Sequence, residues 1–245
     1  VERAMDLFAA EIGMDAAEVR RTNLLASEAF PYTTPTGTSM DSGDYEESLD
    51  RALAAADYAG LRAEQQRRRE AGDPVQMGIG VATYVEITGF GGSEYGEVRL
   101  RSDGTVLAST GATPIGTGHH TTWAMIVADR LGVPLDSIEV FHGDTEVIPS
   151  GSTTGGSRSV QIAGSAMADA SEKLVDLARQ AAADLLEAAP GDVVLDRERG
   201  AFHVAGTPSL ARSWAEIAAA ADEELAGLSD HSQDGATFPF GTHIV

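Results

Sequence analysis

The sequence predicts an α+β fold with mixed sheets and packed helices. Helical and strand patterns are interspersed along the chain, which indicates a layered architecture. Residues 119–131 and 158–188 carry apolar side chains at helical spacing, whereas residues 98–101 and 105–109 alternate around a Ser-Asp-Gly turn. The first pattern is typical of amphipathic helices and the second of a β-hairpin.

The N-terminal part of the chain is predicted to be helical. Apolar residues at helical spacing predict a helix over 2–12, and Gly13 fits its end. Asp15 is placed to cap a second short helix that runs through Arg21. Residues 30–43 are rich in proline and glycine, and we therefore expect a loop there.

Two further helices follow this loop. Asp44 and Glu47 have the spacing of a reciprocal cap, which predicts that a helix begins at Asp44. A very polar helix is expected over 61–71, ended by Gly72. Its three consecutive arginines, 67–69, fit a solvated helix face better than a phosphate-binding patch, because the chain is strongly acidic.

Strands and helices alternate in the rest of the chain. The segments rich in β-forming residues are 79–87, 98–109, 138–142 and 193–204, of which the second and fourth are predicted hairpins. A glycine-rich loop is expected around Phe90. The second long helix, residues 158–188, contains small residues that permit close packing on a sheet or on another helix. A shorter helix capped by Ser213 follows it.

The composition excludes several classes of function. The 245 residues include 17 Lys or Arg and 38 Asp or Glu, a net charge of −21, which disfavours non-specific nucleic-acid binding and anionic membranes. No segment approaches the roughly 20 apolar residues of a membrane span. Cysteine is absent, so disulfides and thiolate-ligated zinc or iron–sulfur centres are excluded on this chain.

Both ends of the sequence lie inside predicted elements. Val1 precedes a helical pattern directly, and residues 237–245 stop as a β-like run begins. We therefore expect this sequence to be a segment of a longer chain.

Two glycine loops are the strongest candidates for a binding site. The first glycine loop (residues 115–122) and the second glycine loop (residues 150–159) each lead from a strand into a predicted helix. Glycine permits close approach of a ligand, and a helix N-terminus attracts anions. Hydroxyl groups and the Arg158 cation add further donors.

Either loop alone is explained as well by a tight turn with a capping Ser or Thr. Neither fits the P-loop or the dinucleotide-binding motif. Because two such loops occur about forty positions apart and both open helices, we expect them to form two walls of one site for a polyanionic ligand.

The histidines and nearby acids give no catalytic or metal-binding pattern. His119 and His120 are adjacent, so on a helix they cannot share a metal as residues four apart do. One is expected to donate at the helix start and the other to pack locally. His142 and His203 are interpreted as structural histidines in strands, and Asp144 and Glu146 as turn carboxylates.

Four stretches together resemble the molybdopterin-binding large subunit of the xanthine dehydrogenase/aldehyde oxidase/carbon monoxide dehydrogenase family. They follow the family order over essentially the whole chain and are closest to the carbon monoxide dehydrogenase branch. The stretches are residues 2–6 with 19–24, residues 30–34 with 41–45, residues 116–122 with 126–129 and 131–134, and residues 143–145 with 156–159.

This resemblance implies a molybdopterin cofactor, as the cytosine dinucleotide in many bacteria, and the fold of the family's molybdenum-cofactor-binding domains. It implies a molybdenum-dependent oxidoreductase that hydroxylates an aldehyde, an N-heterocycle or a carbon monoxide-like substrate. Iron–sulfur and FAD centres are expected on partner subunits, in an oligomer of heterotrimers. A cytoplasmic location is expected, with no nucleic-acid or membrane partner.

The resemblance also assigns cofactor-binding residues within the two loops. They are Gly116, Thr117, Gly118, His119, Gly155, Gly156, Ser157, Arg158 and Ser159. The family commonly has Gln at the position of Thr117, and a hydroxyl side chain has a shorter reach than an amide. The segment around Phe90 falls where the family lines its substrate channel, although its match is poor.

Other parts of the family pattern are absent from this sequence. The family's catalytic Glu and its glycine/phenylalanine loop at the metal do not occur, so no catalytic or metal-ligating residue is assigned. Residues 1–43 are expected to end a first cofactor-binding domain, and residues 44–245 to form most of a second. Two alternatives stay open: a non-catalytic paralogue, and a generic nucleotide-binding module without a redox role.

Overall fold

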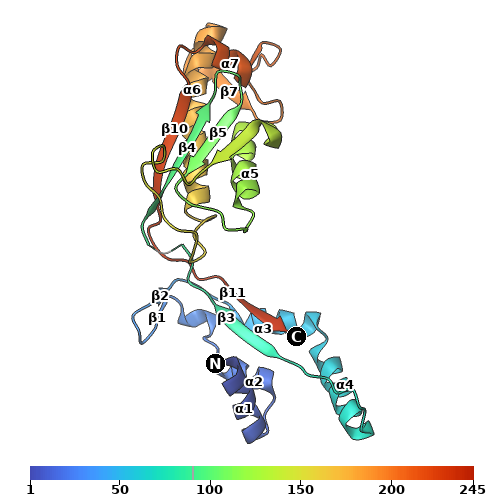
Figure 1. The fold of residues 1–245 in the computed structure, drawn as a ribbon. Helices are drawn as coiled ribbons and strands as arrows, with labels where there is room; N and C mark the ends of the chain where they lie inside the picture. The colour runs from blue at the N-terminus through green and yellow to red at the C-terminus, as the bar shows by residue number, and fades with distance from the viewer. Residues whose placement is uncertain (90) are drawn as a thin grey trace. The chain divides into compact units, whose positions relative to one another are not determined.

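The structure is a computed structural model that describes residues 1–89 and 91–245 (Figure 1). Phe90 and the substrate-channel role implied for it therefore lie outside the described residues. Contacts divide the chain into two compact units: unit 1 comprises residues 1–87 and 237–245, and unit 2 comprises residues 88–236. The predicted domain boundary after residue 43 lies within unit 1 and stays a prediction.

Unit 1 contains the predicted N-terminal helices and two small sheets. Its elements are α1 (Glu2–Ile12), α2 (Ala16–Asn23), a 3₁₀ turn (Ser27–Ala29), β1 (Tyr32–Thr33), β2 (Ser39–Met40), α3 (Tyr45–Ala55), α4 (Tyr58–Ala71), β3 (Val81–Val85) and β11 (Phe240–Ile244). β1 pairs with β2 inside the predicted loop, and β3 pairs with β11, both antiparallel.

The caps of unit 1 follow the sequence prediction with two differences. Asp15 accepts a hydrogen bond from the Ala17 amide, and Asp44 accepts one from the Glu47 amide. The Glu47 carboxylate does not complete the reciprocal cap in the structure; it lies 3.8 Å from Arg51. α4 begins three residues earlier than predicted, because Asp57 caps it through the Gly60 amide.

The described residues of unit 2 form a four-stranded sheet, a three-stranded sheet and three α-helices. The elements are β4 (Ser93–Leu100), β5 (Val106–Thr110), α5 (His119–Leu131), β6 (Ile138–Phe141), α6 (Ala163–Leu186), β7 (Val193–Asp196), β8 (Ala201–Val204), β9 (Ala211–Ser213), α7 (Trp214–Ala220) and β10 (Leu225–Ser232), with 3₁₀ turns at Leu135–Ser137 and Pro190–Asp192. The α+β prediction is confirmed.

The strand order of the four-stranded sheet determines where the two glycine loops lie. The four-stranded sheet has the order β10-β4-β5-β6, in which β5 and β6 are parallel and joined through α5, while the other pairs are antiparallel. The smaller sheet has the order β7-β8-β9. β10 was not predicted, because its sequence, LAGLSDHS, contains no β-branched residue and no Phe, Tyr or Trp.

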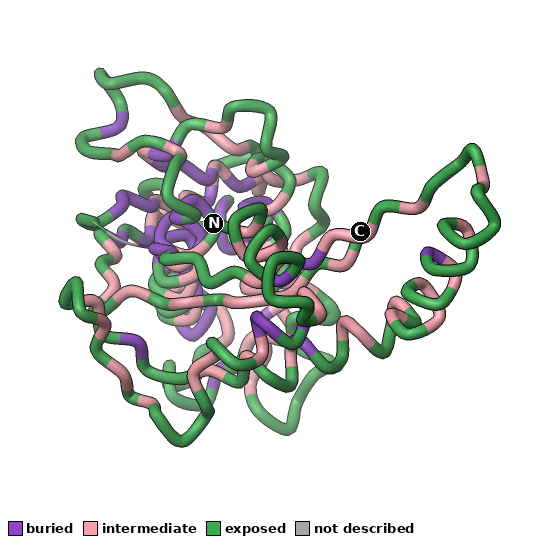
Figure 2. The backbone as a smooth tube through the Cα atoms, turned by 90° about the horizontal axis from the view of Figure 1, so that it is seen from below, coloured by how far each residue is buried: buried purple, intermediate pink, exposed green. Residues whose placement is uncertain are grey.

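Helix α6 lies unusually close to the four-stranded sheet. A Cβ atom on Gly96 of β4 would lie 2.7 Å from the Ala166 backbone, and one on Gly227 of β10 would lie 2.0 Å from the Ala170 carbonyl oxygen. The predicted close packing through small residues is therefore correct. The main buried cluster, which includes Trp123, Met167 and Phe202, lies in this unit (Figure 2).

The beginning of α6 differs from the prediction. The helix runs from Ala163 to Leu186, not from residue 158 to 188. Ser157 has a φ of 53°, which is incompatible with a right-handed helix, and a separate turn follows, closed by the Ile162 amide on the Arg158 carbonyl at 2.7 Å. Among the described residues, no helix has both the length and the apolar character needed to span a bilayer.

Candidate functional site

The two glycine loops emerge at the same edge of the four-stranded sheet. Because β5 and β6 are parallel, their C-terminal ends meet at one edge, which is where ligands bind in many open sheets. A Cβ on Gly111, just after β5, would lie 2.2 Å from the Gly151 Cα. The backbones before the first loop and within the second loop are therefore in contact, as two walls of one site require.

The first glycine loop is exposed and presents its backbone. Gly116 and Gly118 have φ values of 86° and 76°, and Gly118 precedes α5 without a side-chain cap. Thr117 Oγ1 lies 3.0 Å from His119 Nδ1. Within residues 1–89 and 91–245, the N–H groups of residues 116–118 have no acceptor. These groups and the α5 dipole are therefore available to an anion.

The second glycine loop has an exposed tip and a buried end. Gly155, Gly156 and Ser157 are exposed, whereas Arg158 and Ser159 are buried. Ser159 Oγ donates to Thr154 Oγ1 at 2.9 Å, and the Ser159 carbonyl accepts a bond from Trp123 Nε1 of α5 at 2.8 Å. Trp123 thus joins the helix after the first loop to the second loop.

Arg158 points into the protein and not out of the loop. Its Nη1 donates to Ser152 Oγ at 2.6 Å, its Nη2 donates to the Ser93 carbonyl at 3.1 Å, and Nη2 lies 3.9 Å from Glu94 Oε2. The expectation that Arg158 offers its charge to a ligand therefore does not fit its side-chain geometry. Arg158 instead fixes the shape of the loop.

Glu94 is a buried acid that sequence analysis missed. Its carboxylate accepts hydrogen bonds from the amides of Tyr95 and Ser152, each at 3.2 Å. Burial raises the pKa of Glu94, although these hydrogen bonds and Arg158 oppose the shift. An inward-facing Glu in the alternating strand 93–100 was the only available signal.

Three histidines, His119, His120 and His142, lie in or beside the first loop. His119 packs near Trp123, with ring centroids 5.2 Å apart, and His120 Nε2 lies 3.0 Å from His142 Nε2. His142 Nδ1 is buried and has no partner among the described residues, which differs from a satisfied structural histidine. Burial and the neighbouring His120 lower the pKa of His142. His203 lies in β8 as predicted.

Metal-binding groups do not gather in the described part of the chain. No group of three or more His, Cys, Asp or Glu side chains lies close enough there to hold a metal ion. Asp144 accepts a bond from the Glu146 amide at 2.9 Å, as expected for a turn carboxylate.

An open hollow of about 460 Å³ lies where β5 and β6 end. Its lining comes from the segments before the first loop, after β6 and at the start of the second loop: Gly111, Thr113, residues 143–145 and residues 148–152. None of the nine predicted cofactor-binding residues lines it. Asp144 is the one charged residue in this lining.

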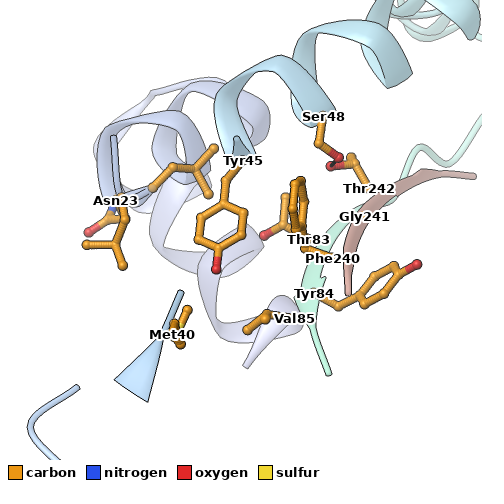
Figure 3. Close-up of a pocket in the computed structure, with 12 residues that line it drawn as sticks. Asn23, Met40, Tyr45, Ser48, Thr83, Tyr84, Val85, Phe240, Gly241 and Thr242 are labelled. Carbon is orange, nitrogen blue, oxygen red and sulfur yellow. Dashed lines mark hydrogen bonds between the residues drawn. The ribbon is translucent and has the colours of Figure 1, made fainter. Parts of the chain in front are cut away.

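A second pocket, of about 220 Å³, lies within unit 1 (Figure 3). It is largely apolar, and its lining includes Met40, Tyr45, Val85 and Phe240. The Tyr45 hydroxyl is buried without a partner in the described part of the chain, and burial raises its pKa. None of the residues that line this pocket is charged.

Comparisons with known proteins agree with the resemblance. Residues 51–245 match the family described as molybdopterin cofactor-binding domain. The chain is 38% identical over 264 residues to the carbon monoxide dehydrogenase large chain of Hydrogenophaga pseudoflava, covering 100% of this chain and 33% of that protein. It is 36% identical to subunit gamma of the 6-hydroxypseudooxynicotine dehydrogenase complex of Paenarthrobacter nicotinovorans, covering 100% of this chain and 32% of that subunit.

A solved structure supports the same relationship. Quinoline 2-oxidoreductase from Pseudomonas putida 86 superposes with a TM-score of 0.83 and 28% identity, covering 99% of this chain and 33% of that chain. The chain thus spans about a third of the length of the proteins it matches.

Proposed function

Because this chain belongs to the molybdopterin cofactor-binding domain family, we propose that it is the central segment of a molybdenum hydroxylase large subunit. The resemblance drawn from the four sequence stretches and the α+β fold of the family are both confirmed. The chain spans only a third of the length of its relatives, and we propose that the whole subunit is a molybdenum-dependent oxidoreductase.

The observation that supports this function best is the pair of exposed loop tips at one sheet edge. The N–H groups of residues 116–118 face no protein acceptor in the described chain, and a Cβ on Gly116 or Gly118 would meet open space. Dipoles of this kind suit the phosphate and ring polar atoms of a large anionic cofactor. The residues present therefore fit the cofactor.

The two loops contribute differently to binding in this proposal. Gly116, Thr117, Gly118 and His119 donate from the first loop, and Gly155, Gly156 and Ser157 donate from the second. Arg158 and Ser159 are buried and hold the second loop in shape. When bound, the cofactor supplies a molybdenum centre that oxidises a small carbon centre with water as the oxygen source.

The finer parts of the proposal rest on the resemblance drawn from the sequence. We propose that the cofactor is the cytosine dinucleotide form and that the substrate is an aldehyde, an N-heterocycle or a carbon monoxide-like molecule. We also propose that the subunit assembles with iron–sulfur and FAD subunits into an oligomer of heterotrimers in the cytoplasm. Support comes from relatives named as the large chain of a dehydrogenase and as a subunit of a dehydrogenase complex. The domain boundary after residue 43 is also retained.

The test is to place a negative charge at each exposed loop tip. In the complete large subunit, Thr117→Glu and Ser157→Glu are each expected to lower molybdenum and pterin content roughly tenfold, because a carboxylate repels the anionic cofactor. Ser209→Glu, in the exposed connection between β8 and β9, is the matched control. Full cofactor content in both loop variants, with control-like melting temperatures, would overturn the site assignment.

One observation favours a non-catalytic paralogue as the second candidate. The Thr117 hydroxyl, at the family's Gln position, is already within hydrogen-bond distance of His119. Molybdenum analysis of the purified complete subunit separates the candidates. Bound molybdenum and pterin would support the hydroxylase. The absence of both would support the paralogue, and a bound nucleotide without molybdenum would support a generic nucleotide-binding module.

A further inference from the structure

We propose that Glu94 is a positioning residue that sets the spacing between the two glycine loops. This inference rests on the proposed function, because it matters for cofactor binding only if the loops hold the cofactor. Glu94 itself touches neither loop tip; it acts through Ser152, Gly111 and Arg158.

The Glu94 carboxylate uses its two oxygens in different directions. Oε1 accepts from the amide of Tyr95 in its own strand, and Oε2 accepts from the amide of Ser152 in the second loop. Both N···O distances are 3.2 Å, and the side chain is buried. The second loop is therefore attached to β4 at its beginning.

The same carboxylate also contacts the approach to the first loop. A Cβ on Gly111 would lie 2.6 Å from Glu94 Oε1 and 2.2 Å from the Gly151 Cα. β5 thus ends against the carboxylate and against the start of the second loop. The position of Glu94 consequently fixes the separation of the two backbones at the point where they diverge.

Arg158 attaches the other end of the second loop to the same place. Its guanidinium bonds Ser152 and the Ser93 carbonyl, and its charge lies beside Glu94. Residues 152 and 158 are therefore both held on β4, while the segment between them extends to the exposed tip. A buried ion pair stabilises a fold little in net terms, but removing one partner leaves an unpaired charge.

A neighbouring acid on the same strand provides a matched control. Glu97 accepts a bond from Arg99 Nε at 2.7 Å and one from the Tyr95 hydroxyl, and in the described part of the chain none of its bonds involves either loop. Glu97→Gln therefore removes a partly buried acid and its ion pair without touching the loops.

The decisive variant is Glu94→Gln, which keeps size and removes one acceptor. A carboxamide has one oxygen, so its NH₂ must face the amide of either Tyr95 or Ser152, where two donors oppose each other. Hydrogen exchange followed by mass spectrometry on the full chain is the measurement. The amides of Ala112 and Ser152 have hydrogen-bond partners in the folded chain and report on the two loops. We expect their exchange to accelerate roughly tenfold in Glu94→Gln and to stay unchanged in Glu97→Gln. Equal exchange in the two variants would overturn the proposal.

Folding is monitored in the same experiment. Exchange within the C-terminal half of α6 must match wild type, which shows that the variant is folded. If Glu94→Gln does not fold, Arg158→Lys replaces it, because a lysine lacks the planar fork whose two nitrogens, Nη1 and Nη2, separately bond Ser152 and the Ser93 carbonyl. Unchanged exchange of residues 150–159 in Arg158→Lys would then contradict the proposal.

Molybdenum content of the complete subunit separates the two hypotheses. If exchange rises and molybdenum content falls, Glu94 positions loops that hold the cofactor. If exchange rises while molybdenum content stays, the proposed function fails but the positioning role stands. If molybdenum content falls while exchange stays, the positioning role fails and the proposed function stands.

Discussion

The two glycine loops have similar compositions but opposite structural support. Residues 116–118 of the first loop carry a single side chain, that of Thr117, and its hydrogen-bond partner among the described residues is His119. The second loop is bound through Ser152, Arg158 and Ser159 to β4 and to Trp123. Similar glycine-rich sequences therefore produce an exposed row of N–H donors in the first loop and a loop held at both ends by side-chain hydrogen bonds in the second.

The loops also differ in how they meet their helices. α5 begins at His119, immediately after Gly118, so the first loop receives the full helix dipole. α6 begins only at Ala163, because a separate turn follows Ser157. The dipole argument therefore applies to the first loop, and the second loop depends on backbone and hydroxyl donors.

The largest expected loss of stability comes from a substitution that disrupts the backbone contact between the two loops. A Cβ on Gly151 would lie 2.4 Å from the Gly111 Cα, so Gly151→Ala must move two backbones and is expected to destabilise the fold by roughly 3 kcal/mol. Gly155→Ala, whose Cβ would meet nothing nearer than Thr153 Cγ2 at 3.8 Å, is the control. Urea unfolding measures both, and equal midpoints would show that the loops are not in contact.

The next effect concerns Trp123. Trp123→Phe leaves the buried Ser159 carbonyl without its donor and is expected to cost about 2 kcal/mol of stability. Trp214→Phe removes the equivalent bond to the Leu131 carbonyl and serves as the control. Both variants should lose stability by calorimetry, but only Trp123→Phe should accelerate hydrogen exchange in residues 150–159. Faster exchange in both variants would contradict the conclusion that Trp123 specifically stabilises this loop.

A smaller change in stability is expected when one hydroxyl is removed from each loop. Ser159→Ala removes the buried bond to Thr154 and is expected to cost about 1 kcal/mol. Thr117→Val removes an exposed hydroxyl and should change stability by less than about 0.5 kcal/mol. Thermal unfolding of the pair measures the difference, and an equal loss from both would contradict the difference in side-chain support between the two loops.

The smallest effect is a pH dependence at His142, beside the helix that follows the first loop. Its folded-state pKa is lowered, so the unfolded chain binds a proton more readily. Its contribution to stability is therefore complete above its ordinary pKa and is lost as pH falls below that value. Urea unfolding between about pH 7.5 and pH 5.5 should show a shallower decline for His142→Asn than for wild type. A parallel decline would exclude this role, and His203→Asn controls for the loss of an imidazole.

Local patterns predicted most of the fold. Caps and helical spacing located α1, α2, α3 and α5, and alternation located the hairpin of β4 and β5. The predicted start of α6 was wrong because residues 158–162 form a separate turn, in which Arg158 contacts Ser152 and the Ser93 carbonyl. β10 was missed because its pairing with β4, and not its residue types, makes it a strand.

The site was predicted in outline only. Glycines before helices indicated the loops, and their parallel strands place them together. The side-chain direction of Arg158 and the role of Glu94 depend on contacts between β4 and the second loop, whose partners lie 58 to 65 residues apart in the sequence. No local pattern encodes such contacts, and for this reason a buried carboxylate in a strand passed unnoticed.

The pairing of β3 with β11 makes unit 2 an insertion within a β-hairpin. Val85 lies opposite Phe240, and the Glu86 amide donates to the Pro239 carbonyl at 2.9 Å. The polypeptide therefore leaves and re-enters unit 1 through adjacent backbone positions. Excision of residues 88–236 leaves two strand ends that a short turn can reconnect, so the connectivity is modular, with one module nested in the sequence of the other.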